Sequence, residues 1–485
     1  MEYSKEIIIV FTSVVYILAI INCIRILARN LQPSTALAWI VFNLGFPFLG
    51  VPMYYLLGQT KVFSYQRRWE KSRKALKQQQ LYQEYVNRSY GLELPGYKNQ
   101  YQEDISNLFR SFGPLYEPIP GNLTILVNGE STFKEIFDAI SAAKNTIFVQ
   151  YYIVRSDRLG NRLKDLLIAK AKEGLKIYFL YDNFGSFFLA SNYLKSLKHA
   201  GIKVASFQPK KFSSILQINF RNHRKAVIVD SKVAFTGGLN VGEEYLGTKK
   251  DRFWRDTHVK IQGPAVQRLE QIFIDDWYYA SKKVIKIEPL KNLKANRKNL
   301  PVKSSQDVVQ IIPFGPNERD DIGLMLFMQL IQSAKQRIWI STPYFIPDET
   351  LMHCLELAAA KNIDLRLIIP KNPDHKSAYW VSTCYASKVL KWNAKIYCYR
   401  DGFLHQKALL IDDKAGLLGT ANFDNRTLFF NFETAVVFYD GKNIEKMEEM
   451  LLDDMRNSDR FYDDEIQGHF ERFARSTTRL LAPIL

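Results

Sequence analysis

Apolar residues fill most of the first sixty positions in two long stretches. Residues 7–24 carry no charge and are mostly Ile, Val and Leu, close to the length that a helix needs to cross a bilayer. A basic segment beginning at Arg25 follows, where a signal peptide would have a small-residue cleavage site. Glycine and proline interrupt the second stretch, residues 35–57, which predicts a kinked span, a re-entrant hairpin or a buried soluble helix.

Basic residues beyond the second stretch predict how the chain is oriented. Seven lysines and arginines lie between Lys61 and Lys77, whereas the loop between the two apolar stretches has only Arg25 and Arg29. The positive-inside rule then puts the bulk of the chain in the cytoplasm, with the N-terminus also inside. We therefore expect a two-segment, multi-pass membrane anchor over residues 1–60 and a basic juxtamembrane region over residues 61–100.

From about residue 100, helical and strand patterns alternate, and the alternation occurs twice. In the first half, helices near 135–143 and 162–173 alternate with strands near 146–153 and 176–181. In the second half, helices near 324–335 and 349–361 alternate with strands starting at 337 and 364. This predicts an α/β fold with layered helices and a buried, largely parallel sheet. A polar linker, residues 291–307, would separate a first half at 101–290 from a second half at 308–485.

One short signature occurs in both halves with identical spacing. The first copy comprises His223, Lys225, Asp230, Gly237, Gly238 and Asn240, and the second comprises His405, Lys407, Asp412, Gly419, Thr420 and Asn422. Two imidazoles can divide the roles of nucleophile and general acid, and two ammonium groups can hold a phosphodiester. The repetition therefore predicts a single site for phosphoryl transfer, built from both halves.

Spacing within the signatures separates the roles of their members. Each His and Lys are two positions apart at an apolar strand, so their side chains should point to the same side. Asp230 and Asp412 complete the catalytic signatures, but each lies seven positions from its His, so we expect it to brace the turn beyond the strand. The small residues would let backbone N–H groups approach a phosphate oxygen, and the asparagines would add side-chain donors.

A third repeated element supplies a carboxylate. Asp256 in the first half and Glu433 in the second each start an apolar strand roughly thirty residues beyond the signature His. A carboxylate that accepts a hydrogen bond from an imidazole fixes its tautomer and supports its positive charge. We expect Asp256 to pair with His223 and Glu433 to pair with His405; surface acids at strand starts are the alternative.

Composition narrows the partners. The chain of 485 residues has a net charge of +17, which indicates an anionic partner and fits nucleic acid and acidic lipid equally. Its four cysteines form no CxxC pair, so neither a zinc site nor a disulfide framework is expected. Because the lysines can supply the positive charge at the phosphate, we expect no metal and no other cofactor.

The signatures, with Asn222-His-Arg-Lys225, Trp254-Arg-Asp-Thr257 and Gly419-Thr-Ala-Asn-Phe-Asp424, resemble the phospholipase D superfamily and, within it, the bacterial cardiolipin synthases. The resemblance covers nearly the whole chain. It implies two α/β halves, each a mixed sheet flanked by helices, around a pseudo-twofold active site. It also implies that His223 is the nucleophile and His405 the general acid. One departure is that the family's common Ser is replaced by Gly238 and Thr420, of which only the Thr keeps the hydroxyl.

The resemblance further implies a reaction and a location. Two phosphatidylglycerol molecules would be joined into cardiolipin through a phosphohistidine, with release of glycerol. The expected partners are phosphatidylglycerol, other anionic phospholipids and the bacterial cell membrane, and no nucleic acid is expected. A phospholipase D-type hydrolase or another phosphatidyltransferase is the near alternative. A nuclease and a noncatalytic membrane scaffold fit less well, because of the apolar stretches in the first case and the two complete signatures in the second.

Overall fold

The computed structural model describes residues 2–28, 33–58, 97–207, 220–247, 253–285, 307–317, 320–439, 441–462 and 477. The expected juxtamembrane region therefore lies outside the described residues up to position 96, and the expected linker does so up to position 306. The described residues divide into two compact units: one contains residues 2–58 and Phe220, and the other contains the remaining described residues of both halves of the catalytic region.

The N-terminal unit is one long helix and a helical hairpin. The long helix is α1 (Glu2–Leu27), and the hairpin is made of α2 (Pro33–Gly45) and α3 (Pro47–Leu57). Within the described residues, only the segment Lys5–Leu27 is long and apolar enough to cross a membrane. The break near Pro47 divides the second apolar stretch into two helices of 13 and 11 residues, each too short to span a bilayer alone.

The hairpin folds back on itself and on α1. Gly50 lies against the α2 backbone, because an added Cβ there would be 2.7 Å from the carbonyl oxygen of Phe42. Such close approach at a small residue is typical of helix packing in membranes. Asn22 of α1 donates a buried hydrogen bond of 2.8 Å to Asn43 of α2, and Arg25 donates an exposed one of 2.6 Å to Tyr55 of α3. The end of α3 therefore lies beside the C-terminal part of α1, whereas the turn of the hairpin lies nearer the middle of α1, where Phe48 packs on Phe11.

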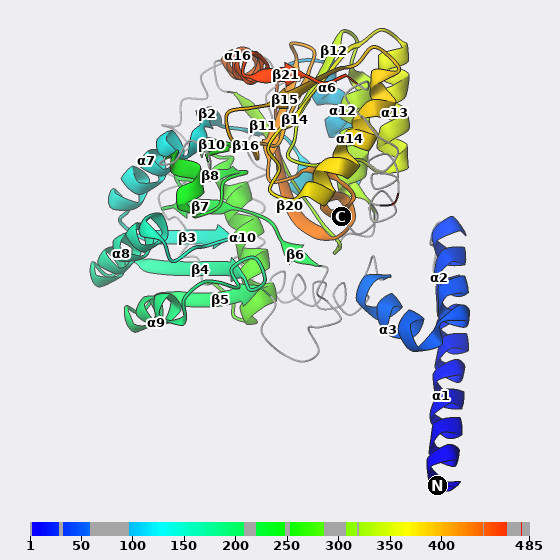
Figure 1. The fold of residues 1–485 in the computed structure, drawn as a ribbon. Helices are drawn as coiled ribbons and strands as arrows, with labels where there is room; N and C mark the ends of the chain where they lie inside the picture. The colour runs from blue at the N-terminus through cyan, green and yellow to red at the C-terminus, as the bar shows by residue number, and fades with distance from the viewer. Residues whose placement is uncertain are drawn as a thin grey trace. The chain divides into compact units, whose positions relative to one another are not determined.

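The first half of the catalytic region is a seven-stranded mixed sheet between helices. Its strand order is β2-β10-β8-β7-β3-β4-β5. The strands are β2 (Asn122–Val127), β3 (Thr146–Tyr151), β4 (Lys176–Asp182), β5 (Lys203–Phe207), β7 (Ala226–Val229), β8 (Val233–Gly237) and β10 (Thr257–Gln262). Helices α7 (Asn128–Ser141), α8 (Arg158–Lys172) and α9 (Ser191–His199) cover one face, and α10 (Val266–Ser281) covers the other (Figure 1). Alternation along β3 explains the two layers, since Val149 packs on the first face and Phe148 contacts Phe273 of α10.

The second half repeats this sheet strand for strand. Its order is β11-β20-β18-β17-β12-β14-β15, with β1 and β21 added at the edges. The strands are β1 (Ile119–Pro120), β11 (Val308–Phe314), β12 (Arg337–Ser341), β14 (Asp364–Pro370), β15 (Lys395–Tyr399), β17 (Ala408–Ile411), β18 (Ala415–Gly419), β20 (Asn431–Tyr439) and β21 (Ser458–Arg460). The helices are α12 (Ile322–Ser333), α13 (Glu349–Ala360), α14 (Lys376–Leu390), α15 (Asn425–Phe429) and α16 (Lys442–Arg456). The matching order confirms the predicted duplication.

Two details differ from the sequence analysis. In the first half only β3, β4 and β5 pair in parallel, and in the second half only β12, β14 and β15 do. The other four pairings within each seven-stranded sheet are antiparallel. The prediction of a largely parallel sheet was therefore wrong, because the strands after each signature return through short turns. In addition, α6 (Gln100–Arg110) and the 3₁₀ turn η1 (Pro114–Tyr116) bury Ile105, Phe109 and Tyr116 in the core of the second half, although they lie within the range expected for the first.

The two halves are joined by buried polar contacts. Arg255 of the first half forms an ion pair of 2.8 Å with Asp454 on α16, and Thr257 donates a hydrogen bond to Gln406. Arg224 donates to the carbonyl oxygen of Glu433 at 3.0 Å. Buried charges without partners are strongly destabilising, so these contacts hold the halves in one arrangement. The site described next lies at this junction.

Candidate active site

Each signature histidine lies between two strands at the junction of the halves. His223 follows β6 (Arg221–Asn222) and precedes β7, and His405 follows β16 (Phe403–Leu404) and precedes β17. β6 runs parallel to the start of β20 in the other half, and β16 runs parallel to β9 (Trp254–Arg255). The backbone N–H of His223 donates to the carbonyl of Phe432, and that of His405 donates to the carbonyl of Arg255. Each histidine is thus carried on a strand of its own half that pairs with the other half.

The carboxylates pair with the histidines across the junction. Nδ1 of His223 lies 2.9 Å from Oε1 of Glu433, and Nδ1 of His405 lies 2.6 Å from Oδ2 of Asp256. The prediction that Asp256 pairs with His223 and Glu433 with His405 was therefore wrong. Each carboxylate pairs with the histidine of the opposite half. With Nδ1–H donating to the carboxylate, the other ring nitrogen, Nε2, is left to act on a substrate.

Sheet geometry explains the exchange of partners. Within the first half, β8 separates β7 from β10, so the signature strand and the carboxylate strand lie two strand spacings apart, about 10 Å. β18 separates β17 from β20 in the same way. A short carboxylate cannot cross that distance within its own sheet. The opposite half brings its carboxylate strand directly alongside the histidine, through the pairings of β6 with β20 and of β9 with β16.

The small-residue positions of the signatures support the carboxylates. An added Cβ at Gly238 would lie 2.1 Å from Oδ1 of Asp256, so only glycine leaves room for this carboxylate. At the equivalent position, the hydroxyl of Thr420 donates to Oε2 of Glu433. The hydroxyl of Thr420 therefore supports the carboxylate, and its expected role at the phosphate stays a prediction. The departure from the family's common Ser follows the unequal lengths of Asp and Glu.

Burial keeps both imidazoles neutral in the free protein. It lowers the pKa of His223 to about 4, with Lys225 and Lys407 adding to the shift and Glu433 opposing it. Burial lowers the pKa of His405 well below its usual value, and Lys407, Lys225 and His223 add to that shift. Because both lysines act on both histidines, the two signatures form one electrostatic unit rather than two separate sites.

The lysines are buried as well. Burial and the neighbouring Lys407 lower the pKa of Lys225 well below its usual value, while Glu433 opposes the shift. Burial lowers the pKa of Lys407 to about 8, with Asp256 and Glu433 opposing it. Nζ of Lys225 donates to the carbonyl oxygen of His223 at 2.7 Å, and Nζ of Lys407 lies 3.1 Å from Nδ1 of His405. Both lysine amino groups therefore lie beside their histidines, as the two-residue spacing predicts.

The signature aspartates brace turns, as the spacing predicts. Asp230 accepts hydrogen bonds from the backbone N–H groups of Lys144, Asn145 and Thr146. Asp412 does the same for residues 335–337. Both aspartates have a φ of 52°, a left-handed conformation that Asp adopts more readily than most residues. Asp230 thereby holds the turn after β7 against the start of β3, and Asp412 holds the turn after β17 against the start of β12.

The signature asparagines are engaged in structural contacts. Asn240 accepts a hydrogen bond from the N–H of Ile153 and donates one of 3.1 Å to the hydroxyl of Tyr245. Asn422 donates to Asp424 at 2.9 Å. These contacts position neighbouring residues, and the predicted role of both asparagines as phosphate donors stays a prediction.

Aromatic side chains that the sequence analysis did not single out surround the histidines unequally. The ring of Tyr152 packs edge-on to His223 with centroids 5.0 Å apart. His405 contacts three rings, those of Trp254 at 5.0 Å, Phe403 at 5.8 Å and Tyr245 at 6.0 Å. The sequence offers one indication of these neighbours, since aromatic residues lie beside the repeated elements, such as Trp254 two positions before Asp256. The two histidines are almost equally buried, but the environment of His405 is the more aromatic of the two.

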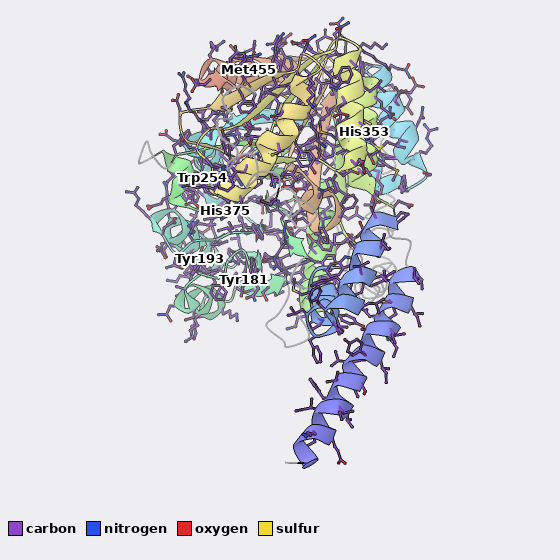
Figure 2. All side chains as sticks on the ribbon, turned by 45° about the vertical axis from the view of Figure 1, so that its right-hand side comes forward. Tyr181, Tyr193, Trp254, His353, His375 and Met455 are labelled. Carbon is purple, nitrogen blue, oxygen red and sulfur yellow. The ribbon has the colours of Figure 1, made fainter. Side chains whose placement is uncertain are left out.

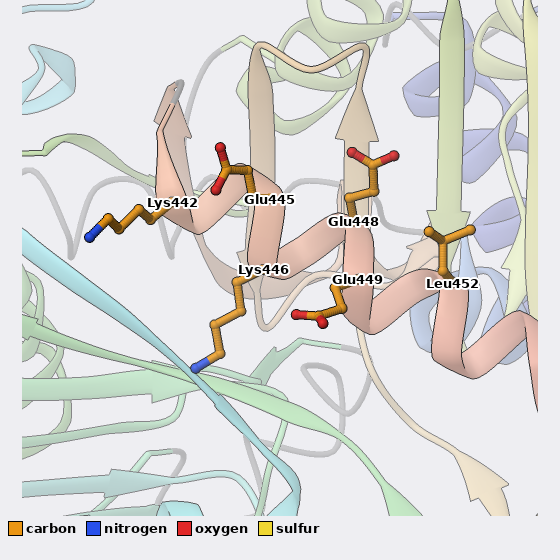
Figure 3. Close-up of a pocket in the computed structure, with 6 residues that line it drawn as sticks. All are labelled: Lys442, Glu445, Lys446, Glu448, Glu449 and Leu452. Carbon is orange, nitrogen blue, oxygen red and sulfur yellow. The ribbon is translucent and has the colours of Figure 1, made fainter.

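Two other features lie apart from this site. A hollow of about 610 Å³ is lined by Lys442, Glu445, Lys446, Glu448, Glu449 and Leu452 (Figure 3). All six come from α16 and none belongs to a signature; Glu448 pairs with Arg337, and Lys446 donates to the carbonyl of Ile125. His353 is an exposed residue on α13, apart from Trp254 (Figure 2), and lies beside Glu356. These contacts make both features part of the ordinary charged surface.

Comparisons with known proteins show which family the chain is similar to. The family described as "Cardiolipin synthase, PLD-like domain" matches residues 136–277 and 327–455, and one described as "Phospholipase_D-nuclease N-terminal" matches residues 14–59. Cardiolipin synthase 2 of Bacillus anthracis is 37% identical over 96% of this chain and 90% of its own length. Cardiolipin synthase of Geobacillus kaustophilus is 37% identical over 98% of this chain and 92% of its own length. The crystal structure of a phosphatidylserine synthase of Haemophilus influenzae covers 80% of this chain and all of its own, with a TM-score of 0.59 and 16% identity, which shows a shared fold.

The duplicated sheets and the paired signatures define a protein of the phospholipase D superfamily. Within that superfamily, the near full-length matches show that the chain belongs to the cardiolipin synthase family. It is therefore a phosphatidyltransferase, as the resemblance predicts.

Proposed function

We propose that the enzyme transfers a phosphatidyl group from one phosphatidylglycerol to another, giving cardiolipin and glycerol. The observation that carries the proposal is the pair of buried histidines, His223 and His405, each held by a carboxylate of the other half beside a lysine. Two imidazoles with separate partners suit a reaction with one nucleophile and one acid–base group. The names of the relatives support cardiolipin as the product.

In the first step, Nε2 of His223 attacks the phosphorus of the donor lipid. The bond from phosphorus to the glycerol oxygen breaks, and His405, protonated, gives its proton to that oxygen. The low pKa of His223, about 4, keeps the attacking ring neutral near pH 7. The negative charge of the bound phosphodiester would raise the pKa of His405, Lys225 and Lys407, which favours the protonated acid and two ammonium groups. The products of this step are glycerol and phosphatidyl-His223.

In the second step, the primary hydroxyl of a second phosphatidylglycerol attacks the phosphohistidine. His405, now neutral, takes the proton of that hydroxyl, and the bond between phosphorus and Nε2 of His223 breaks. This step forms a phosphodiester bond to a primary alcohol, and the first step broke a bond of the same kind. The free energy of the overall exchange is therefore small. Water would give phosphatidic acid instead, and the burial of both histidines and the aromatic rings around His405 disfavour its entry.

For the anchor, we propose one spanning helix, α1, and a re-entrant hairpin made of α2 and α3. Of the helices that the structure describes, only the segment Lys5–Leu27 has the length of a span. The hairpin begins at Pro33, shortly after α1 ends, and Tyr55 near its other end accepts a hydrogen bond from Arg25. The basic residues after Leu57 favour a cytoplasmic catalytic region. With a hairpin, the N-terminus would lie on the opposite face of the membrane, unlike the expectation from two full spans. Labelling of single cysteines at positions 2 and 100 in sealed vesicles tests this, since labelling of both from the same side would refute the hairpin.

The catalytic proposal is tested with purified full-length protein in phosphatidylglycerol vesicles. We expect cardiolipin and free glycerol in equal amounts, and transient radiolabelled phosphatidyl on the protein when the lipid phosphate is labelled. Phosphatidic acid as the sole product would indicate a hydrolase. Cleavage of a single-stranded oligonucleotide with no reaction on lipid would indicate a nuclease.

A further inference from the structure

Three phenylalanines are exposed together on the loop between β4 and α9. We call residues 183–190 the phenylalanine loop. Phe184, Phe187 and Phe188 are 53%, 66% and 87% exposed, and the rings of Phe187 and Phe188 pack on each other with centroids 5.4 Å apart. In the described part of the catalytic region, the other large exposed apolar residues stand singly along the sequence: Tyr97, Leu357, Trp392 and Tyr462. A cluster of exposed aromatic rings marks a contact surface.

The phenylalanine loop is rigidly fixed at its base. Oδ1 of Asp182 accepts hydrogen bonds from the N–H groups of Phe184 and Gly185, at 2.9 and 3.0 Å. The hydroxyl of Ser186 donates to the carbonyl of Tyr152 and accepts from the N–H of Val154. Gly185 packs so closely that an added Cβ would lie 2.5 Å from the carbonyl oxygen of Tyr152. The exposure of the rings is therefore imposed by the fold.

The same contacts tie the loop to the backbone that carries His223. Oδ2 of Asp182 accepts a hydrogen bond of 3.0 Å from the N–H of Asn222, the residue before His223. Tyr152, whose carbonyl receives Ser186, places its ring against His223. The guanidinium of Arg221 lies 4.0 Å from the centre of the Phe184 ring. The exposed rings thus project from the nucleophile's side of the active site.

Charge along this part of the chain indicates what the rings contact. Residues 183–220 contain five lysines and no aspartate or glutamate, whereas the cations that follow, Arg221, Arg224 and Lys225, are buried. Helix α9, which begins directly after the loop, carries Lys195 and Lys198 on exposed positions. Exposed aromatic rings with basic flanks are typical of segments that lie in the interface of an anionic leaflet. Nucleic acid also combines cations with stacking aromatics, but the family of this chain acts at a lipid headgroup.

We propose that the phenylalanine loop inserts Phe187 and Phe188 into the interface of an anionic phospholipid leaflet, and so holds the His223 side of the active site against the surface that supplies the lipid. The proposal rests on the lipid substrate proposed above and extends it to the route by which the lipid arrives. Because the loop is rigid, insertion orders no flexible segment and costs little conformational entropy.

The first test compares two forms of the same substrate. We expect the double variant Phe187→Ser/Phe188→Ser to lose about tenfold in kcat/KM on phosphatidylglycerol vesicles, equivalent to one decade in transition-state binding. On short-chain phosphatidylglycerol below its critical micelle concentration, the variant should match the unaltered protein within about twofold. The matched control, Trp392→Ser, removes another exposed ring and should leave both activities unchanged. An equal loss on both substrates, or no loss on either, would overturn the proposal.

The second test needs no activity, so it stands even if the lipid reaction is not cardiolipin synthesis. Full-length Phe188→Trp and Leu357→Trp are each reconstituted into phosphatidylglycerol nanodiscs with acyl chains brominated near the headgroup, and their emission is compared with that of the unaltered protein. The new tryptophan at position 188 should be quenched, and the one at 357 should not. Equal emission of both new tryptophans refutes insertion. Quenching of position 188 by a single-stranded oligonucleotide, but not by lipid, would instead identify a nucleic-acid surface.

Discussion

The two halves of the catalytic region share a sheet and a signature but surround their histidines differently. His223 has one aromatic neighbour, Tyr152, and its glutamate is held by the hydroxyl of Thr420. His405 lies among three aromatic rings, and its aspartate lies in the space left by Gly238. The two halves therefore share the signature residues, whereas the surroundings of the two histidines differ, as the proposed division of roles requires.

The loops after the equivalent strands β4 and β14 differ in the same way. The phenylalanine loop of the first half exposes apolar rings, whereas residues 371–375 of the second half are Lys-Asn-Pro-Asp-His. There Lys371 pairs with Asp459, and Asp374 accepts a hydrogen bond from Tyr344. One side of the site is thus suited to an apolar environment and the other to a polar one. Under the proposed reaction, such a difference would suit lipid tails and a small polar product that leave by different routes.

The largest expected effect separates the roles of the histidines. On phosphatidylglycerol, His223→Ala and His405→Ala should each lose about 10⁴-fold in kcat. From a phosphatidyl ester of p-nitrophenol, the leaving group departs as the stable p-nitrophenolate anion and needs no proton from an acid. With this substrate, His405→Ala should still release a burst of p-nitrophenolate, and His223→Ala should not. The burst is followed by absorbance. The opposite result would exchange the two roles, and bursts from both variants would remove the site assignment.

The exchanged carboxylates give the next largest effect. Glu433→Gln should slow phosphoenzyme formation by about 100-fold with either leaving group, because it acts through His223. Asp256→Asn acts through His405, so it should slow phosphoenzyme formation from phosphatidylglycerol to a similar extent. With the p-nitrophenyl substrate, whose leaving group needs no acid, this variant should react at nearly the rate of the unaltered protein. If each carboxylate served the histidine of its own half, the two patterns would be reversed. Asp230→Ala serves as the control, since loss of its brace should lower the melting temperature without distinguishing the two substrates.

A smaller effect tests the small-residue positions. Gly238→Ser should displace the Asp256 carboxylate, because its Cβ would lie 2.1 Å from Oδ1, and so reproduce the substrate pattern of Asp256→Asn. Thr420→Val removes one hydrogen bond to Glu433 and should cost about tenfold in kcat. Thr420→Ser keeps the hydroxyl and should cost little. Full activity of Gly238→Ser would show that Asp256 does not need its present position.

How far the sequence predicts this molecule can be seen from these elements. Strand and helix patterns near 146, 176, 337 and 364 predict elements that the structure has within a few residues, because period and caps are local properties. The repeat itself predicts that the two signatures converge. The spacing of Asp230 predicts its bracing role, which is also a local property.

The partners of Asp256 and Glu433 could not be predicted in the same way. Which carboxylate reaches which histidine depends on β8 and β18 lying inside their sheets and on the pairing of β6 with β20, and no sequence interval contains that information. The packing of α6 on the second half is likewise a long-range property. The exposed rings of the phenylalanine loop were missed because an apolar run reads the same whether it is buried or exposed.

The smallest effect concerns pH and the lysine beside His405. As pH rises through about 8, Lys407 loses its proton in the free enzyme, and with it one positive charge for the phosphate. We expect kcat/KM on phosphatidylglycerol to fall about fourfold between pH 7 and pH 8.5, measured as glycerol release at constant ionic strength. The fall in kcat should come at higher pH, because the bound phosphodiester raises the pKa of the lysine. Lys407→Arg stays charged throughout this range, so its activity, although lower, should lack the alkaline fall. An unchanged alkaline fall in that variant would assign it to another group, of which the buried Lys225 in the opposite half is the first to examine.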